Sequence, residues 1–331
     1  MTELGMTPVL PSFTGFVPMN TTRVLPDAQI VRGTQWARFP LQSSNDSFLE
    51  QFDDNFAKLQ SSFLSKQRAA YGNVSHIYTL DKYNENSPCS GDLDYLRNVT
   101  FNTWKSLKQA DSRSPCNLDD TRLAFLRTAG VLVRRTSRSL LLGCKDNNHM
   151  LNLDPFSKSA LQWRRTRSYY GRQWIWCQVH DYESNMGLYG QLTNITVNAT
   201  QARESPSLVG YGLTMEGQEG NEIVYTGLLE QTWSATPLDT KKHFHDWVAS
   251  RYSGSGSIPN RLCEAWELMR TTDFDNTDTS VTSVIKSAFE IRPSLENIRG
   301  GFQSTEPTYD PLVVVQAWQK LYQAASSEPV L

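Results

Sequence analysis

Short apolar runs alternate with longer helical patterns along the first part of the chain. Apolar runs of about four to eight residues bounded by turn residues are typical of buried strands, whereas repeats at three and four residues are typical of amphipathic helices. The predicted strands are Met6–Phe13, His76–Leu80, Met150–Leu153, Trp174–Val179 and Ser207–Leu213. Helices are predicted at Asp46–Ala70 and Leu93–Leu107. In the first of these helices, one apolar stripe is formed by Phe48, Phe52, Phe56, Leu59 and Phe63.

From Asn221 onwards the pattern becomes helical throughout. The predicted helices are Asn221–Trp233, Lys241–Tyr252, Arg261–Met269, Ser280–Phe289 and Pro311–Ala325. Strands that alternate with helices favour parallel β/α units, and such units close into a (β/α)₈ TIM barrel when eight are present. Because five strands are recognised, we expect an α/β fold with an incomplete barrel in residues 1–220, followed by a truncated all-α domain in residues 221–331.

The segment Ser112–Lys145 does not fit this alternation. It is rich in arginine and serine and shows no clear helical or strand period. One interpretation is a basic surface loop with a helix near Thr121–Val133. The other is an aberrant segment, translated from a shifted frame or a retained intron, which would pack poorly and pair little with the sheet. No aromatic residues are interleaved to stack on bases, so a nucleic-acid patch is disfavoured.

Composition excludes several function classes. With 32 basic and 34 acidic residues, the chain has no global attraction for nucleic acid or anionic membranes, and no apolar run is long enough to span a bilayer. Five cysteines occur without a C-x-x-C pair. His243 and His245 lie two apart, which puts them on different sides of a helix, so we expect solvent-facing residues and no shared metal. No metal site or cofactor is predicted.

Two acidic residues directly follow predicted strands. Glu85 follows His76–Leu80, and Glu216 follows Ser207–Leu213. Since the C-terminal strand ends build the active-site face of a β/α barrel, two carboxylates there could hydrolyse a glycosidic bond. From spacing alone, these two acids could equally well cap helices or lie exposed on the surface. His180 ends a third strand, where a structural hydrogen bond is the common role, and Trp36 fits either a core or a sugar platform.

Four segments resemble the α-N-acetylglucosaminidase family, glycoside hydrolase family 89. They are ELGMTPVLPSFTGFVP (Glu3–Pro18), HIYTLDKYNENSP (His76–Pro88), SYYGRQWIWCQVHDY (Ser168–Tyr182) and LVGYGLTMEGQEGNEIVY (Leu208–Tyr225). The resemblance implies a TIM barrel with a helical domain after it. It also implies a retaining exo-glycosidase that removes terminal α-linked N-acetylglucosamine, from heparan sulfate in animals, without metal or organic cofactor.

The resemblance also implies the roles of individual residues. Glu85 matches the general acid/base and Glu216 the nucleophile, while Asn84, Trp36 and His180 match positions that line the sugar pocket. In an α-glucosaminide the 2-acetamido group lies on the same face as the leaving group and cannot displace it. Such an enzyme must therefore supply its own nucleophile.

Departures from the family pattern temper this expectation. The resemblance implies that the N-terminal domain, the first barrel strands and most of the helical domain are missing. Lys158 and Ala160 stand where an acid and a proline are expected, and Glu183-Ser184 replaces a Gly-Gly pair. We therefore expect the isolated chain to be inactive. A catalytically dead sugar-binding protein and a non-functional gene-model fragment are the alternatives.

The cellular location stays open at this point. Family members are secreted, lysosomal or vacuolar, and six N-glycosylation sequons, at Asn20, Asn45, Asn73, Asn98, Asn194 and Asn198, would suit a glycoprotein. The first residues, Met1 to Val9, lack the pattern of a signal peptide. Oligomeric state cannot be predicted from these features.

Overall fold

A computed structural model describes residues 1–33, 35, 39–40, 42–44, 46–80, 88–111, 122–126, 134–144, 149–180, 189–216, 221–253, 257–277 and 309–327. Two compact units divide the chain. The first consists of Met1–Asp154, Gln162–Ile175 and Ser205–Gly210, and the second of Pro155–Leu161, Trp176–Glu204 and Tyr211–Leu331.

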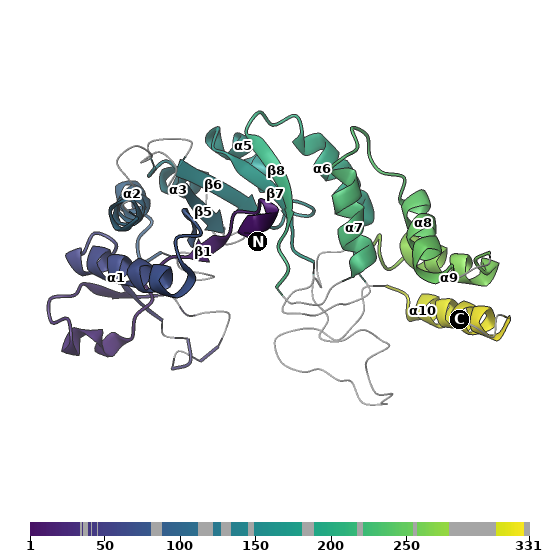
Figure 1. Ribbon diagram of the computed structural model, residues 1–331, viewed down its shortest axis with the longest axis horizontal. Coiled ribbons are helices and arrows are strands. Elements are labelled where there is room, and N and C mark those ends of the chain that lie inside the picture. Colours follow the sequence, from purple (N-terminus) through teal and green to yellow (C-terminus); the bar gives the residue numbers. More distant parts are fainter. Residues whose placement is uncertain are drawn as a thin grey trace. The chain divides into compact units, whose positions relative to one another are not determined.

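A six-stranded sheet has the order β1-β4-β5-β6-β7-β8 (Figure 1). The strands are β1 (Val9–Pro11), β4 (Ile77–Leu80), β5 (Arg122–Leu126), β6 (Met150–Asp154), β7 (Trp174–Gln178) and β8 (Leu208–Leu213). From β1 to β6 every neighbouring pair is parallel. Between β7 and β8, the Trp174 N–H donates to the Ser207 carbonyl and the Thr214 N–H to the Gln178 carbonyl, so these strands also advance together. Parallel pairing is therefore confirmed from β1 to β6, and the bonds between β7 and β8 agree with it.

Strand β5 lies inside the segment that we expected to lack regular structure. It pairs in parallel with β4 on one side and β6 on the other, with Leu123 opposite Met150. Helix α3 (Arg134–Leu141) follows it, and Leu140 and Leu141 at its end are buried. The expectation that this segment pairs little with the sheet is therefore wrong for the residues that the structure describes, whereas its origin in a shifted frame or a retained intron stays a hypothesis. A five-residue strand between arginine-rich flanks has too few positions to show a period, and its two sheet neighbours supply the hydrogen bonds that define it.

Helix α1 (Asp54–Tyr71) begins later than the apolar pattern predicted. The Asp53 carboxylate accepts the Asn55 N–H at 2.7 Å and caps the helix, and Gly72 ends it with a φ of 78°. Residues Ser47–Leu49 form strand β3 instead, which pairs with β2 (Ile30–Arg32) in an antiparallel ribbon. The predicted helix Asp46–Ala70 therefore combines a strand, a cap and a helix.

The apolar stripe expected on this helix is also corrected. Phe56 and Leu64 are fully buried, and Gln60 lies between them on the same face. Phe52 and Phe63 are 43% and 39% exposed. Phe48 is buried from β3 and not from the helix. Because the helix starts at residue 54, its core-facing residues are Phe56, Gln60 and Leu64 and not the predicted set of five apolar residues.

The prediction of helix α2 (Leu93–Ala110) is confirmed, and the residue after this helix contacts strand β4. The last residues of α2 lead into the buried Asp111, whose carboxylate accepts a hydrogen bond from the Tyr78 hydroxyl at 3.1 Å. Arg68 of α1 lies 3.7 Å from the same carboxylate. A buried carboxylate needs such partners, so these contacts tie α1 and the end of α2 to strand β4.

Helix α6 (Leu192–Ala202) was not predicted. Its sequence is rich in threonine, isoleucine and valine, which favour strands over helices. The buried Leu192, Ile195, Ala199 and Ala202 recur at three and four residues, which is the helical signal that could have found it. Packing of this narrow face overrides the weak local propensity. Two short helices, α4 (Gln162–Arg165) and α5 (Arg167–Tyr170), precede β7.

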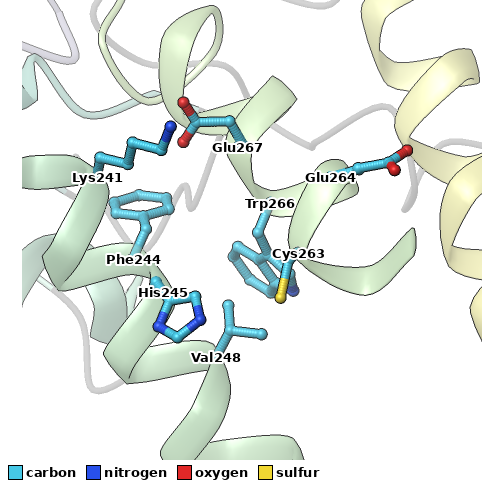
Figure 2. A pocket seen from close by; sticks show the side chains of 8 residues that line it. All are labelled: Lys241, Phe244, His245, Val248, Cys263, Glu264, Trp266 and Glu267. Carbon is cyan, nitrogen blue, oxygen red and sulfur yellow. The ribbon is translucent and has the colours of Figure 1, made fainter. Parts of the chain in front are cut away.

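The last described part is helical, as predicted. Its helices are α7 (Glu222–Gln231), α8 (Thr240–Tyr252), α9 (Asn260–Thr271) and α10 (Pro311–Ser327). The predicted helix Ser280–Phe289 lies outside the described residues. Between α8 and α9 there is a cavity of about 220 Å³ with an apolar wall of Phe244, Val248 and Trp266 (Figure 2). No described helix combines the length and apolar character that a bilayer span requires.

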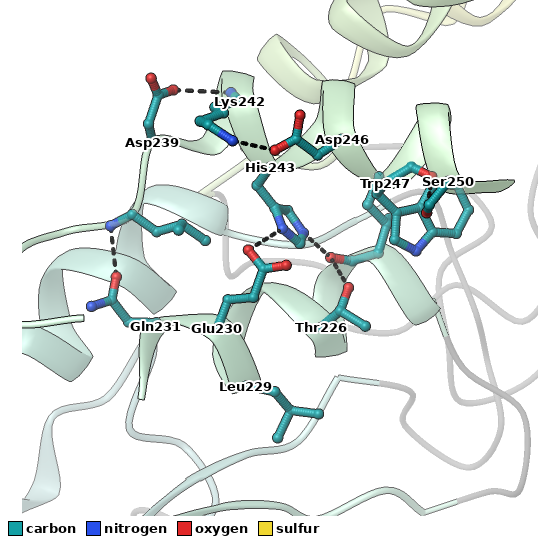
Figure 3. Close-up of polar contacts among 12 residues, drawn as sticks. Thr226, Leu229, Glu230, Gln231, Asp239, Lys242, His243, Asp246, Trp247 and Ser250 are labelled. Atoms are coloured by element: carbon teal, nitrogen blue, oxygen red, sulfur yellow. Dashed lines mark hydrogen bonds and ion pairs between the residues drawn. The ribbon is translucent and has the colours of Figure 1, made fainter. Parts of the chain in front are cut away.

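His243 links α8 to α7 and corrects the expectation that both histidines face solvent (Figure 3). Its side chain is 1% exposed, with Nδ1 2.9 Å from the Glu230 carboxylate and Nε2 2.9 Å from the Ile223 carbonyl. His245 is exposed, as expected. The partner helix, which the i, i+2 spacing does not reveal, decides which of the two histidines is buried.

We expect His243→Ala to destabilise the protein by about 1–3 kcal/mol, because it leaves a cavity and removes two hydrogen bonds between the helices. His245→Ala is the matched control, and its effect should stay within about 0.5 kcal/mol. Urea unfolding followed by circular dichroism measures both values. Equal effects of the two variants would contradict the assigned contact.

Candidate functional site

The predicted site residues fall into two groups. Glu85, Asn84 and Trp36 lie outside the described residues. His180 and Glu216 are described, and both belong to the second unit. His180 follows the C-terminal end of β7, and Glu216 follows that of β8, with its side chain exposed. Because β7 and β8 are parallel neighbours, these two residues leave the sheet at the same edge.

His180 is buried, with 3% exposure, and three side chains hold its ring. Its Nε2 lies 2.9 Å from the Asn221 amide nitrogen. The Tyr189 ring lies parallel to it, with centroids 6.3 Å apart and an angle of 6°, and Tyr225 approaches edge-on at 5.5 Å and 89°. These contacts come from two separate segments, the start of α7 and the residues before α6, so the imidazole has one well-defined orientation.

A buried lysine lies in the same group of residues. Lys158 follows β6 and is 1% exposed, and its ammonium lies 5.2 Å from the centre of the Tyr189 ring. The Asn198 amide donates to the Lys158 carbonyl at 2.9 Å, which ties this turn to α6. The Val179 N–H donates to the Pro155 carbonyl at 2.9 Å and brings the turn alongside the end of β7.

Burial, and then the positive charge of Lys158, hold the pKa of the His180 imidazole well below its usual range. The imidazole is therefore neutral at physiological pH, with one ring nitrogen as donor and the other as acceptor. A neutral histidine can bind a sugar hydroxyl but cannot serve as a permanent cation. The site thus offers, on the His180 ring, one hydrogen-bond donor and one acceptor in fixed positions.

The segment before α6 is anchored by residues that follow α9. The Leu192 N–H donates to the Phe274 carbonyl at 3.1 Å, and the Asp275 carboxylate accepts bonds of 2.7 Å from both the N–H and the hydroxyl of Thr193. A side chain at Gly190 would overlap the Phe274 carbonyl, so glycine is required for this close approach. Tyr189, which covers His180, is positioned in this way.

Sequence reasoning missed several residues around His180. Tyr189, Asn221 and Tyr225 lie within or beside the family-like segments, but no pattern indicated that they contact the histidine. Lys158 was noted as a departure from the family, yet its proximity to His180 comes from the pairing of β6 with β7. Among the described residues, no group of three His, Cys, Asp or Glu side chains forms a metal site.

Beside this anchor lies a buried carboxyl group, Asp273. Burial raises the pKa of Asp273 to about 6. The pKa of Tyr309 is raised to about 12 by burial of its hydroxyl group and by the negative charge of Asp273. The Thr272 side chain lowers the pKa of Asp273, but its effect is smaller than that of burial. Ionisation of this carboxyl group is therefore unfavourable for the folded state.

We expect Asp273 to make the folded protein lose stability between about pH 4 and pH 6. Over this range the unfolded chain releases the proton while the folded state keeps it, so the stabilisation present at low pH disappears. Asp273→Asn should flatten this slope and raise stability at pH 7 by roughly 1–3 kcal/mol. Thermal unfolding across pH 3.5–7.5 would show both effects.

The control is Asp275→Asn. Asp275 follows α9, and its carboxylate contacts Thr193 at the N-terminus of α6. There the carboxylate accepts two hydrogen bonds, so its loss should lower stability at pH 7. The two neighbouring Asp→Asn changes are thus expected to have opposite signs. A lower stability of both variants at pH 7 would contradict the assignment for Asp273.

Comparison with known proteins places these observations in a family. A family model described as the α-N-acetylglucosaminidase TIM-barrel domain matches residues 1–235, and one described as the α-N-acetylglucosaminidase C-terminal domain matches residues 243–330. Human α-N-acetylglucosaminidase is 29% identical over 334 residues, covering 99% of this chain and 43% of the human protein. The chain therefore spans less than half the length of that relative.

Solved structures show the same fold. A family 89 glycoside hydrolase from Clostridium perfringens, in complex with 2-acetamido-1,2-dideoxynojirmycin, matches with a TM-score of 0.80 and 21% identity, over 98% of this chain and 35% of the other. A double glutamate-to-glutamine variant of the C. perfringens enzyme, in complex with its substrate GlcNAc-α-1,4-galactose, matches with the same score, identity and coverage. At this identity, the likeness concerns the fold.

Proposed function

This chain belongs to the α-N-acetylglucosaminidase family, and on that premise we propose that it is a retaining exo-glycosidase which hydrolyses terminal α-linked N-acetylglucosamine from glycans. The observation that carries the proposal is the family match over residues 1–235, which includes every candidate site residue. We propose further that residues 1–220 belong to a (β/α)₈ barrel and that the helical domain begins at residue 221. The parallel strand order supports this arrangement.

In the proposed mechanism, the Glu216 carboxylate attacks the anomeric carbon while Glu85 transfers its proton to the departing glycosidic oxygen. This step forms a glycosyl ester on Glu216 and releases the rest of the glycan. Glu85, now ionised, takes a proton from water, whose oxygen displaces Glu216 from the anomeric carbon. Two inversions give net retention, and the two carboxyl groups of such enzymes lie about 5–5.5 Å apart.

The exposed position of Glu216 at the end of β8 supports its role as nucleophile, because an ionised carboxylate is needed there. Its negative charge raises the affinity of a nearby acid for its proton, which is what Glu85 requires before the first step. We propose that His180, Asn84 and Trp36 bind the sugar. In this group, His180 contributes a neutral, rigidly held imidazole.

Release of N-acetylglucosamine from an aryl α-N-acetylglucosaminide tests the proposal, and turnover would overturn the expectation from the sequence that the isolated chain is inactive. We expect Glu85→Gln and Glu216→Gln each to lower the turnover number by at least about 10²–10⁴-fold, since each removes a group that acts in the transition state. Proton NMR of the first product formed should show the α-anomer, as retention requires. Glu222→Gln is the control: this exposed carboxylate at the start of α7 pairs with Arg251 at 3.1 Å, and its loss should leave turnover within about twofold.

Other outcomes separate the alternatives. Sugar binding without turnover would support a catalytically inactive sugar-binding protein, and the substitution of an expected acid by Lys158 would then mark the loss of activity. Absence of both binding and turnover would support a non-functional fragment. Turnover unaffected by Glu216→Gln would overturn the assigned nucleophile.

A further inference from the structure

Asn221 occupies the N-cap position of α7 but does not cap it with its side chain. A cap residue of this type ordinarily accepts an amide N–H of the first helical turn through its side-chain oxygen. Here the first bonds are made by the Asn221 backbone carbonyl, which accepts the N–H groups of Val224 at 2.9 Å and Tyr225 at 3.1 Å. Among the described amides of α7, none bonds to the Asn221 side chain.

The Asn221 side chain is directed at His180 instead. Its amide nitrogen lies 2.9 Å from Nε2 of the imidazole. An amide nitrogen can only donate, so Nε2 must accept with its lone pair. The single proton of the neutral ring then resides on Nδ1. The environment agrees with this assignment, because burial and the nearby Lys158 charge both disfavour the doubly protonated ring.

Two aromatic rings prevent the imidazole from turning over. Tyr225 lies one helical turn after Asn221, so α7 presents both side chains to His180 from the same face. Tyr189 lies parallel to the imidazole, and Gln191 donates to the Tyr189 hydroxyl. A rotation of the ring by half a turn would put the carbon Cε1 in the place of Nε2 and break the contact with Asn221.

The other ring nitrogen, Nδ1, is buried and has no hydrogen-bond partner among the described residues. A buried donor without an acceptor is unfavourable, and an acceptor that reaches it gains the full benefit of the bond. In a protein of this family, the natural acceptor is a hydroxyl or the acetamide oxygen of the bound sugar.

We propose that Asn221 is a positioning residue that fixes His180 as the Nδ1–H tautomer, so that this proton is donated to bound N-acetylglucosamine. The inference rests on the proposed function for the identity of the ligand. The tautomer itself follows from the contacts of Asn221 and His180, and it can be tested without turnover.

Two variants of Asn221 and one control variant of Asp239 separate the orientation of His180 from folding. Asn221→Ser keeps an N-cap residue of similar strength but cannot reach His180, so α7 should remain while the tautomer is released. Asn221→Asp also caps well but presents only acceptors, so it should favour a proton on Nε2. Asp239→Asn, at the cap of α8, is the matched control, because Asp239 caps its own helix through the Lys241 and Lys242 amides.

The experiment is nitrogen NMR of the full chain with ¹⁵N-labelled histidine, in which five histidines give resolvable imidazole signals. His180→Gln identifies the signals of His180. In the unmodified chain we expect two widely separated signals, with Nδ1 at the protonated position and Nε2 at the unprotonated one. Asn221→Ser should bring the two signals towards their average, Asn221→Asp should reverse them, and Asp239→Asn should leave them unchanged.

Titration with N-acetylglucosamine completes the test and is expected to shift the Nδ1 signal. A proton on Nε2 in the unmodified chain, or unchanged signals in Asn221→Ser, would overturn the positioning role. Sugar binding that leaves Nδ1 unshifted would overturn the donation to the ligand. If no sugar binds while the signals respond to Asn221 as expected, the positioning role is upheld and the proposed function is the part that fails.

Discussion

Parallel strand pairing is the constraint on which the candidate site depends. In a parallel sheet, every strand ends at the same edge, so the segments after the strands meet there regardless of their distance in sequence. Strands β6, β7 and β8 deliver Lys158, His180 and Glu216 to that edge. The Thr214 N–H bond to the Gln178 carbonyl links the ends of β7 and β8. The Val179 N–H bond to the Pro155 carbonyl, at an antiparallel bridge between Phe156 and Gln178, ties the turn after β6 to the end of β7.

A buried positive charge distinguishes the interior of this site. Lys158 is enclosed beside the Tyr189 ring, and its charge acts on His180. Burial of an ammonium group is costly, and the aromatic face offsets a part of this cost. The family resemblance places an acid at this position, which would act on a neighbouring histidine in the opposite direction. Lys158 therefore adds to the effect of burial, which is the larger cause of the low pKa of the His180 imidazole.

Helix α7 connects the site to the helical part of the second unit. Near its first turn, Asn221 and Tyr225 contact His180, and towards its end Glu230 contacts the buried His243 of α8. The Ile223 carbonyl, in the first turn, accepts from the other nitrogen of His243. Both histidines are held by polar atoms of one short helix. A shift of α7 along its axis would consequently disturb both contacts together.

The amino-acid sequence by itself determined the family, the alternation of strands and helices, and the places of most elements. The run Trp174–Gln178 stands out by its apolar composition, and the stripe of α10 carries enough positions to define a period. The four family-like segments identified Glu85 and Glu216 as the candidate catalytic pair, which no periodicity could single out.

Tertiary structure decided what depends on partners distant in the chain. Strand β5 exists because β4 and β6 flank it, and α6 is helical because one narrow face is buried, although its composition favours a strand. His243 is buried and His245 exposed because α7 lies against one side of α8. Asn221 stands at the N-cap of α7, but its side chain contacts His180, because the hydrogen bond available across the fold replaces the local one. Local sequence carries the preferences of each segment, whereas these choices depend on contacts that form only when the segments pack together.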